Sequence, residues 1–240
     1  IAAIFESAGA IIAGGEVVTT IKNGIIDPKQ IADVELYVYA MIAALLAGAI
    51  WLNLATAMGA PVSTTHSIVG AVLGAGVAAG GWHIVNWASM GAIAASWVVS
   101  PVLGGLVAAL FLFWIKRSIT YQTDMVQAAK KMVPILVALM AWAFTTYLAL
   151  KGLNKLIKLT TFEAGLIGLA VAAVVYVLVR SAVKNNASSL HNTKDSINSL
   201  FTIPLIFAAA LLSFAHGAND VANAIGPLAA IYDALVNNTI

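Results

Sequence analysis

Polar side chains interrupt the apolar segment Leu205–Ile231, in the stretch SFAHGANDVANAIGP (213–227). Asp220 and Asn223 are three residues apart and share one face of a helix, next to Asn219. Carboxylate, amide and backbone carbonyl oxygens are the ligands that hard cations prefer. We therefore expect Asp220, Asn223 and Asn219 to form a cation site inside the membrane. The alternative is a polar contact between helices.

Glycine and proline surround this candidate cation site. Gly217 precedes it, and the pair Gly226–Pro227 follows it. Both kinds of residue can interrupt a helix, which frees backbone carbonyl groups to point at an ion. We expect an unwound segment of a membrane helix here, because broken helices of this kind bind ions in transporters.

A second stretch, GAPVSTTHSIVG (59–70), carries donors for an anion. Pro61 suits the first turn of a helix, where backbone N–H groups have no partner. Hydroxyl groups fall on the same turn, from Ser63, Thr64 and Thr65. Together these donors form a helix-end anion site that needs no fixed positive charge. The alternative is a helix start that the hydroxyls merely cap, and His66 can either donate to an anion or pack.

Acidic residues within apolar segments are a third signal. An ionised side chain at the bilayer centre costs at least about 2.5–3.5 kcal/mol, so such residues usually line a pathway or have a partner. Glu6 and Asp220 lie in apolar segments. All twelve Lys and Arg residues fall outside these segments, at 22–36, 116–132, 151–163 and 180–204. We therefore expect Glu6 to contribute to cation binding together with Asp220.

The composition identifies a membrane protein. Of the 240 residues, 61% are hydrophobic and 9% are charged, and the mean hydropathy is +0.95. Ordinary globular domains carry about 25% charged residues. The basic residues form no patch, so nucleic acid is not an expected partner, and the lack of cysteine excludes disulfides and thiolate metal sites. The expected surroundings are the lipid bilayer of the plasma or inner membrane, crossed several times.

Long apolar runs predict an all-α, polytopic fold. A bilayer core about 30 Å thick needs about 20 apolar residues of helix. Runs of this kind are Ile1–Ile21, Leu36–Ala60, Val133–Leu150, Ala164–Val179 and the interrupted Leu205–Ile231. The stretch Pro61–Ile115 can form two crossings, or a re-entrant hairpin and one crossing, with a break expected at Pro101 and Gly104–Gly105. The most basic linker, Lys116–Met132, is expected in the cytoplasm.

These motifs resemble a known family. HGANDVANAIGP (216–227) and PVSTTHSIVG (61–70) look like the two signatures of the inorganic phosphate transporter family, the sodium/phosphate symporters. The stretch FESAGAIIAG (5–14) is similar to that family's acidic segment, which implies that Glu6 is the acid needed for transport. The phosphate-binding residues implied by the motifs are Ser63, Thr64, Thr65 and Asn223, and the implied sodium ligands are Asp220 and Asn223.

The resemblance also implies a domain organisation. The family is built from two inverted repeats, each with one motif of either kind. Residues 1–115 would be part of the first transporter repeat, 116–204 the linking helices and a cytoplasmic loop, and 205–240 the start of the second repeat. The missing partner motifs would precede Ile1 and follow Ile240, so we expect a fragment of an inverted-repeat transporter with broken or re-entrant helices.

The site residues and the family resemblance together predict a secondary active transporter that moves inorganic phosphate in symport with a cation. The expected cation is sodium, and no cofactor is expected. Open alternatives are a proton-coupled permease, a permease for a related oxyanion (sulfate or a metal–phosphate complex) and a passive channel. The oligomeric state is also open, and a membrane homodimer is one arrangement that the sequence allows. A lesser alternative is an intramembrane hydrolase with the triad Ser63, His66 and Asp220, although no GxSxG elbow is present. We expect no enzymatic activity.

Overall fold

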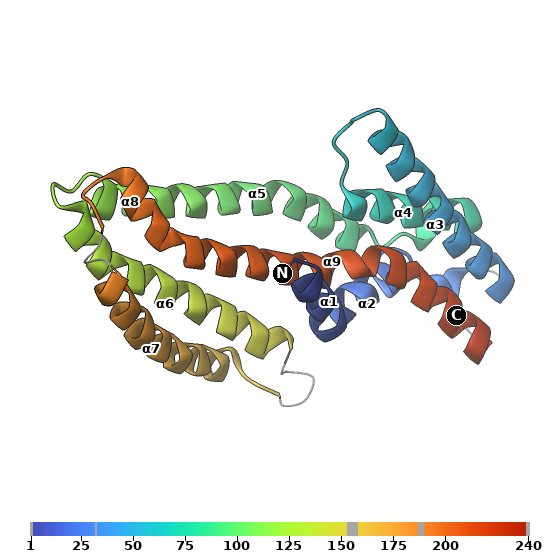
Figure 1. The fold of residues 1–240 in the computed structure, drawn as a ribbon. Coiled ribbons are helices and arrows are strands. Elements are labelled where there is room, and N and C mark those ends of the chain that lie inside the picture. The colour runs from blue at the N-terminus through green and yellow to red at the C-terminus, as the bar shows by residue number, and fades with distance from the viewer. Residues whose placement is uncertain (1, 32, 153–157, 187–189, 239–240) are drawn as a thin grey trace. The chain divides into compact units, whose positions relative to one another are not determined.

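The computed structural model describes residues 2–31, 33–152, 158–186 and 190–238 (Figure 1). The helices are α1 (Ala2–Ala13), α2 (Gly15–Asn23), α3 (Val34–Ala57), α4 (Thr64–Gly80), α5 (Trp87–Ile115), α6 (Met125–Lys151), α7 (Thr161–Asn186), α8 (Lys194–Asn198) and α9 (Thr202–Asn237). Within the described ranges, extended pairing is limited to one antiparallel bridge, between Ile26 and Val85. The expected all-α fold is confirmed.

The lengths of these helices are those of a multi-pass membrane protein. In the part of the chain that the structure describes, five helices are long and apolar enough to cross a bilayer, namely α3, α5, α6, α7 and α9. Helices α1 and α2 meet at an angle of 61° next to Gly14, as in a broken span, and α4 is a shorter apolar helix. The chain is a multi-pass membrane protein, as expected.

The stretch Pro61–Ile115 forms a short helix and then one long crossing. Helix α4 ends at Gly80, and α5 continues to Ile115 with Pro101 inside it. The break expected at Pro101 and Gly104–Gly105 was therefore wrong. A proline removes one backbone hydrogen bond, whereas an unwound turn facing lipid leaves several backbone groups unpaired, each at a cost of several kcal/mol. The continuous helix loses fewer hydrogen bonds.

Helix α9 is also continuous where the sequence predicted a break. It is helical from Thr202 to Asn237, so the stretch 213–227 is not unwound, and Pro227 lies inside the helix. As at Pro101, a continuous helix loses one backbone hydrogen bond at the proline, whereas an unwound turn would lose several. Its glycines permit close packing instead of a break, since Gly217 lies against the backbone of Glu6 on α1.

The chain forms two compact units, Ile1–Val99 with Ser213–Ile240 and Ser100–Leu212. The core of the first unit includes Ile25, Ile26, Met41, Val72 and Ile84, and that of the second includes Ile119, Val133, Val137, Val183 and Ile197. The division of the chain into transporter repeats stays a prediction, because a repeat is defined by its symmetry with a second copy and not by its compactness.

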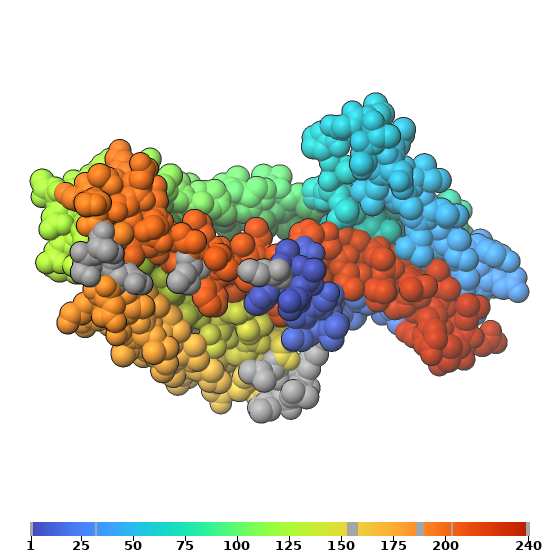
Figure 2. Space-filling model, in the orientation of Figure 1, coloured from blue at the N-terminus to red at the C-terminus, as the bar shows by residue number. Residues whose placement is uncertain are grey.

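In the first unit, α1 packs directly on α9 through glycine (Figure 2). A Cβ atom at Gly9 would overlap the backbone of Phe214, and a Cβ atom at Gly217 would overlap the backbone of Glu6. Small residues let membrane helices approach each other closely, and glycine permits the closest approach. This contact fixes α1 on α9, and with it the position of Glu6.

The connection between α3 and α4 is short and sets the start of α4. Gly59 has a φ of 66°, and the N–H of Ala60 donates to the carbonyl of Ala55 at 2.9 Å. This is a Schellman arrangement, which favours glycine at the left-handed position. Pro61 then leads within two residues to Ser63, the N-cap of α4. The threonines of the motif therefore occupy the first turn of α4.

Candidate ion-binding site

His216 on α9 contacts two acidic residues that lie in apolar segments, Glu6 and Asp220. Its Nδ1 atom lies 3.1 Å from Oε1 of Glu6, and its Nε2 atom lies 3.2 Å from Oδ2 of Asp220. A neutral imidazole donates from one nitrogen only, so the tautomer decides which of the two carboxylates accepts the hydrogen bond. From the sequence we expected no basic partner for either acid, so this role of His216 was missed. Its four-residue spacing from Asp220 indicates one contact, whereas the contact with Glu6 depends on the packing of α1 on α9.

The first turn of α4 reaches α9 through a hydroxyl group. Oγ1 of Thr64 donates to Oδ2 of Asp220 at 3.2 Å. Ser63 caps the helix, because its Oγ atom accepts from the N–H of His66 at 3.3 Å. The N–H groups of Thr64 and Thr65 have no acceptor within the helix. Donors for an anion therefore lie beside the carboxylate of Asp220.

Asn223 is the residue at which the two motifs meet. Its Nδ2 atom lies 3.1 Å from Oγ1 of Thr64, 3.3 Å from Oγ1 of Thr65 and 3.3 Å from Oδ1 of Asp220. These three oxygen neighbours determine which end of the amide is the nitrogen. The other end, Oδ1, is buried and has no hydrogen-bond donor among the described residues. A buried acceptor without a donor costs about 1–3 kcal/mol, so this oxygen is a candidate ligand for a cation.

Oxygen atoms of Asn223 and Asp220 are candidate ligands for a hard cation. Pro227 has no N–H, so the backbone carbonyl of Asn223, four residues earlier, lacks its helical donor. Oδ1 of Asn223 is the other end of the amide whose Nδ2 lies 3.3 Å from the carboxylate of Asp220, and the side chain of Asp220 is 31% exposed. In the described ranges, no group of three or more His, Cys, Asp or Glu residues could hold a metal ion. The set therefore suits a monovalent cation held by oxygen more than a transition metal.

The structure brings together most of the residues expected at the site, namely Glu6, Thr64, Thr65, Asp220 and Asn223. Two others stay outside this network. Ser63 is exposed and caps α4, and Asn219 is exposed on α9 without a hydrogen bond to the other described site residues. Proximity alone does not show what a residue binds, so each of these roles stays a prediction.

Comparison with known proteins gives the family. A family model described as "Phosphate transporter family" matches residues 1–240. The chain belongs to this family. The resemblance carried by the two motifs is therefore confirmed. A Helicobacter pylori protein named "Putative phosphate permease" is 55% identical over 236 residues, which cover 98% of this chain and 44% of that protein. A similarly named Pyrococcus abyssi protein is 37% identical over 234 residues, 97% of this chain and 56% of that protein.

A solved structure named "The sodium-dependent phosphate transporter" has the same fold. It matches with a TM-score of 0.90 and 34% sequence identity, over 100% of this chain and 58% of that chain. This member of the phosphate transporter family thus spans about half the length of the curated relatives that it matches. The activity of the whole protein is accordingly a proposal.

The described side chains do not assemble a hydrolase triad in this phosphate transporter family member. Oγ of Ser63 accepts from the backbone N–H of His66, and the imidazole ring of His66 packs on Trp97, with ring centroids 4.1 Å apart. Asp220 forms its hydrogen bonds with other residues. The ring of His66 is therefore not placed between Ser63 and Asp220, where a triad would need it.

An ion pair between α2 and α9 was also missed by reasoning from the sequence. Nζ of Lys22 pairs with Oδ2 of Asp233, and the hydroxyl of Tyr37 lies 3.5 Å from the carbonyl oxygen of Lys22. The paired residues are 211 positions apart, so no local pattern indicates their contact. The bent pair α1–α2 is thus held on α9 by glycine packing along α1 and by this ion pair at the end of α2.

Proposed function

We propose that the whole protein moves inorganic phosphate across the membrane in symport with sodium. The observation that carries the proposal is the buried Oδ1 atom of Asn223, which lacks a donor among the described residues and lies in the same side chain that contacts Asp220. The nitrogen end of the same amide faces the hydroxyl groups of Thr64 and Thr65 at the start of α4. One end of this amide suits a cation, and the other adjoins donors for an anion.

Charge repulsion explains why the anion would need a cation at this site. Phosphate at pH 7 carries between one and two negative charges, and Asp220 adds another. At about 6 Å and an effective dielectric constant of about 20, each pair of like unit charges repels by about 3 kcal/mol. A sodium ion held by Asp220 and Asn223 would offset this repulsion. Phosphate and sodium would then bind cooperatively, each raising the affinity of the other by the same factor.

The ligand set and the relatives both favour this pair of substrates. An amide oxygen and a backbone carbonyl bind a metal ion but take up no proton at neutral pH, which favours sodium over proton coupling. A neighbour with the same fold is also named for sodium dependence. Relatives are named as phosphate permeases, which favours phosphate over sulfate or a metal–phosphate complex. A homodimer stays a prediction.

Uptake of radiolabelled phosphate into proteoliposomes tests the proposal with the whole protein. We expect accumulation when a sodium gradient points inward at fixed pH, and none with an equal potassium gradient. Accumulation driven by an inward proton gradient without sodium would show that the coupled ion is a proton and not sodium. Phosphate flux that neither saturates nor depends on any gradient would indicate a passive channel and contradict the proposal.

Thr64→Val should raise the apparent KM for phosphate about ten- to a hundredfold, because a lost hydrogen bond to a charged ligand costs about 1.5–3 kcal/mol. Valine keeps the shape of threonine and removes the hydroxyl that lies between Asp220 and Asn223. The matched control is Thr56→Val on α3, where the hydroxyl donates to the carbonyl of Leu52 in its own helix. Saturation curves for phosphate uptake give both KM values. An unchanged KM in folded Thr64→Val protein would remove Thr64 from the phosphate site.

A further inference from the structure

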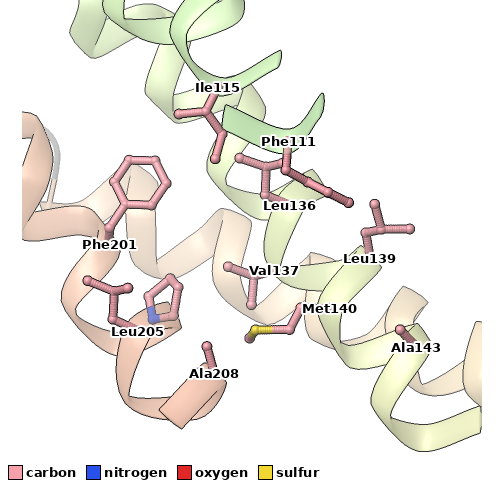
Figure 3. A pocket seen from close by; sticks show the side chains of 11 residues that line it. Phe111, Ile115, Leu136, Val137, Leu139, Met140, Ala143, Phe201, Leu205 and Ala208 are labelled. Atoms are coloured by element: carbon pink, nitrogen blue, oxygen red, sulfur yellow. The ribbon is translucent and has the colours of Figure 1, made fainter. Parts of the chain in front are cut away.

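The second unit contains a cavity of about 350 Å³ between α5, α6 and the start of α9 (Figure 3). Every described side chain that lines it is apolar. Phe111 comes from α5, Met140 from α6, and Leu205 and Ala208 from α9. Ligand-binding cavities in proteins range from about 300 to 1,000 Å³, so this one is large enough for part of a ligand. Its lining accepts a hydrocarbon chain and offers nothing to a polar group.

A second cavity, of about 320 Å³, adjoins the first and is polar at one side. The two share Ile115, Phe201 and Leu205 in their linings, so they are neighbours. The second cavity is also lined by polar side chains, from Thr120, Lys194 and Asn198. The combined space is therefore amphipathic, with an apolar cavity beside a polar one carrying a positive charge.

The charge at the polar end has no counter-ion among the residues that the structure describes. Among the described residues, no carboxylate forms an ion pair with Lys194, whose side chain is exposed. The π-helical turn that contributes Thr120 also carries Lys116 and Arg117, both exposed. This turn belongs to the basic linker that the charge distribution places in the cytoplasm. The cytoplasmic leaflet is the one that carries anionic phospholipids, and basic pockets between membrane helices on this side bind their head groups.

We propose that the two cavities bind one anionic phospholipid. One acyl chain lies in the apolar cavity, between Phe111, Met140 and Leu205, and the phosphate of the head group lies against Lys194. Lipid tails are as apolar as leucine, so transfer of an acyl chain from the bilayer into this cavity gives little net free energy. The selection of one lipid over another therefore rests on the head group, and Lys194 is the residue that discriminates.

A lipid fits the combined cavity better than a further helix of the protein. A transmembrane helix can fill the apolar cavity, but it supplies no negative charge to Lys194 unless it also carries an acidic residue beside the polar cavity. A phospholipid supplies the hydrocarbon chain and the negative charge in one molecule. These two parts match the apolar lining and the positive charge of the two cavities.

Native mass spectrometry of the full-length protein in mild detergent measures the head-group preference. We expect the parent protein to bind phosphatidylglycerol in preference to phosphatidylcholine, and Lys194→Gln to weaken phosphatidylglycerol binding about fivefold, the usual contribution of one lysine near anionic lipid. Lys184→Gln is the matched control, since Lys184 lies at the end of α7 and lines neither cavity. Equal binding of the two lipids by the parent, or equal weakening by both substitutions, would overturn the proposal.

Filling the apolar cavity tests the position of the acyl chain. Ala208→Phe should abolish retention of phosphatidylglycerol, whereas Ala209→Phe, one position along α9 and outside the lining, should leave it unchanged. Ala143→Leu narrows the same cavity from α6 and provides a second, milder variant. Retention at the parent level in Ala208→Phe or Ala143→Leu would refute the lipid site. Loss of folding in both lining variants but not in Ala209→Phe would show that another part of the protein fills the cavity, and would refute it equally.

Discussion

Asp220→Asn is expected to abolish the sodium stimulation of phosphate binding, and with it sodium-driven uptake. The substitution keeps the size of the side chain and removes the negative charge from the candidate cation site. Without this charge the site has only neutral oxygens, from Asn223 and from the new amide, to offer a sodium ion. Phosphate would also lose the repulsion that makes sodium necessary, so the variant should bind phosphate to the same extent with and without sodium.

Equilibrium binding of radiolabelled phosphate to the purified full-length protein, with increasing sodium at constant ionic strength, measures this effect. Asp124→Asn is the matched control, because Asp124 caps α6 through its side-chain oxygen, which asparagine retains. Sodium stimulation at the parent level in Asp220→Asn would show that Asp220 is not the coupling ligand. Stimulation by acidification alone, in parent and variant, would identify the coupled ion as a proton.

Gly217→Ala should abolish uptake and lower the thermal stability of the protein. The added Cβ atom would overlap the backbone of Glu6, and no rotation of a side chain can relieve an overlap with backbone. Overpacking of this kind typically costs about 1–3 kcal/mol, which outweighs the gain of about 0.8–1 kcal/mol from replacing glycine by alanine within a helix. The remaining response is a shift of α1, which moves Glu6 away from His216.

Gly74→Ala is the matched control for this substitution, because a Cβ atom at Gly74 on α4 meets no described atom within 4 Å. The same gain in helix propensity applies there without the overlap, so the control should be neutral or slightly stabilising. Thermal unfolding of the purified proteins and phosphate uptake into proteoliposomes compare the two. Equal unfolding temperatures for Gly217→Ala and Gly74→Ala would show that α1 does not pack on α9 as described.

Local sequence patterns predicted the features that depend on neighbouring residues. The length of the apolar runs set the helices, because each run has to satisfy its own backbone hydrogen bonds in lipid. The oxygen atoms on α9 and the hydroxyls at the start of α4 were predicted from their spacing to form a cation site and an anion site. Neither pattern alone indicated that the two candidate sites meet at Asn223. That proximity was expected only because a symporter needs both sites.

Contacts between distant residues could not be predicted from such patterns. His216 reaches Glu6 because two glycines let the backbones of α1 and α9 approach, and Lys22 reaches Asp233 because α2 follows on the same side. One of these two glycines, Gly217, was interpreted as a helix breaker, since sequence alone does not distinguish a glycine that ends a helix from one that packs it. Only the position of the neighbouring helix decides between these uses.

The amide of Asn223 also has an electronic consequence. Its two N–H protons face three acceptor oxygens, so one acceptor is always short of a proton. A cation at Oδ1 draws electron density toward that end of the amide and makes the N–H groups stronger donors. The hydroxyl of Thr64, which accepts from this nitrogen, becomes a stronger donor in turn, an effect of about 10–30% per hydrogen bond. Because that hydroxyl donates to Asp220, a cation bound as proposed would be felt at the first turn of α4 by polarisation, before any helix has moved.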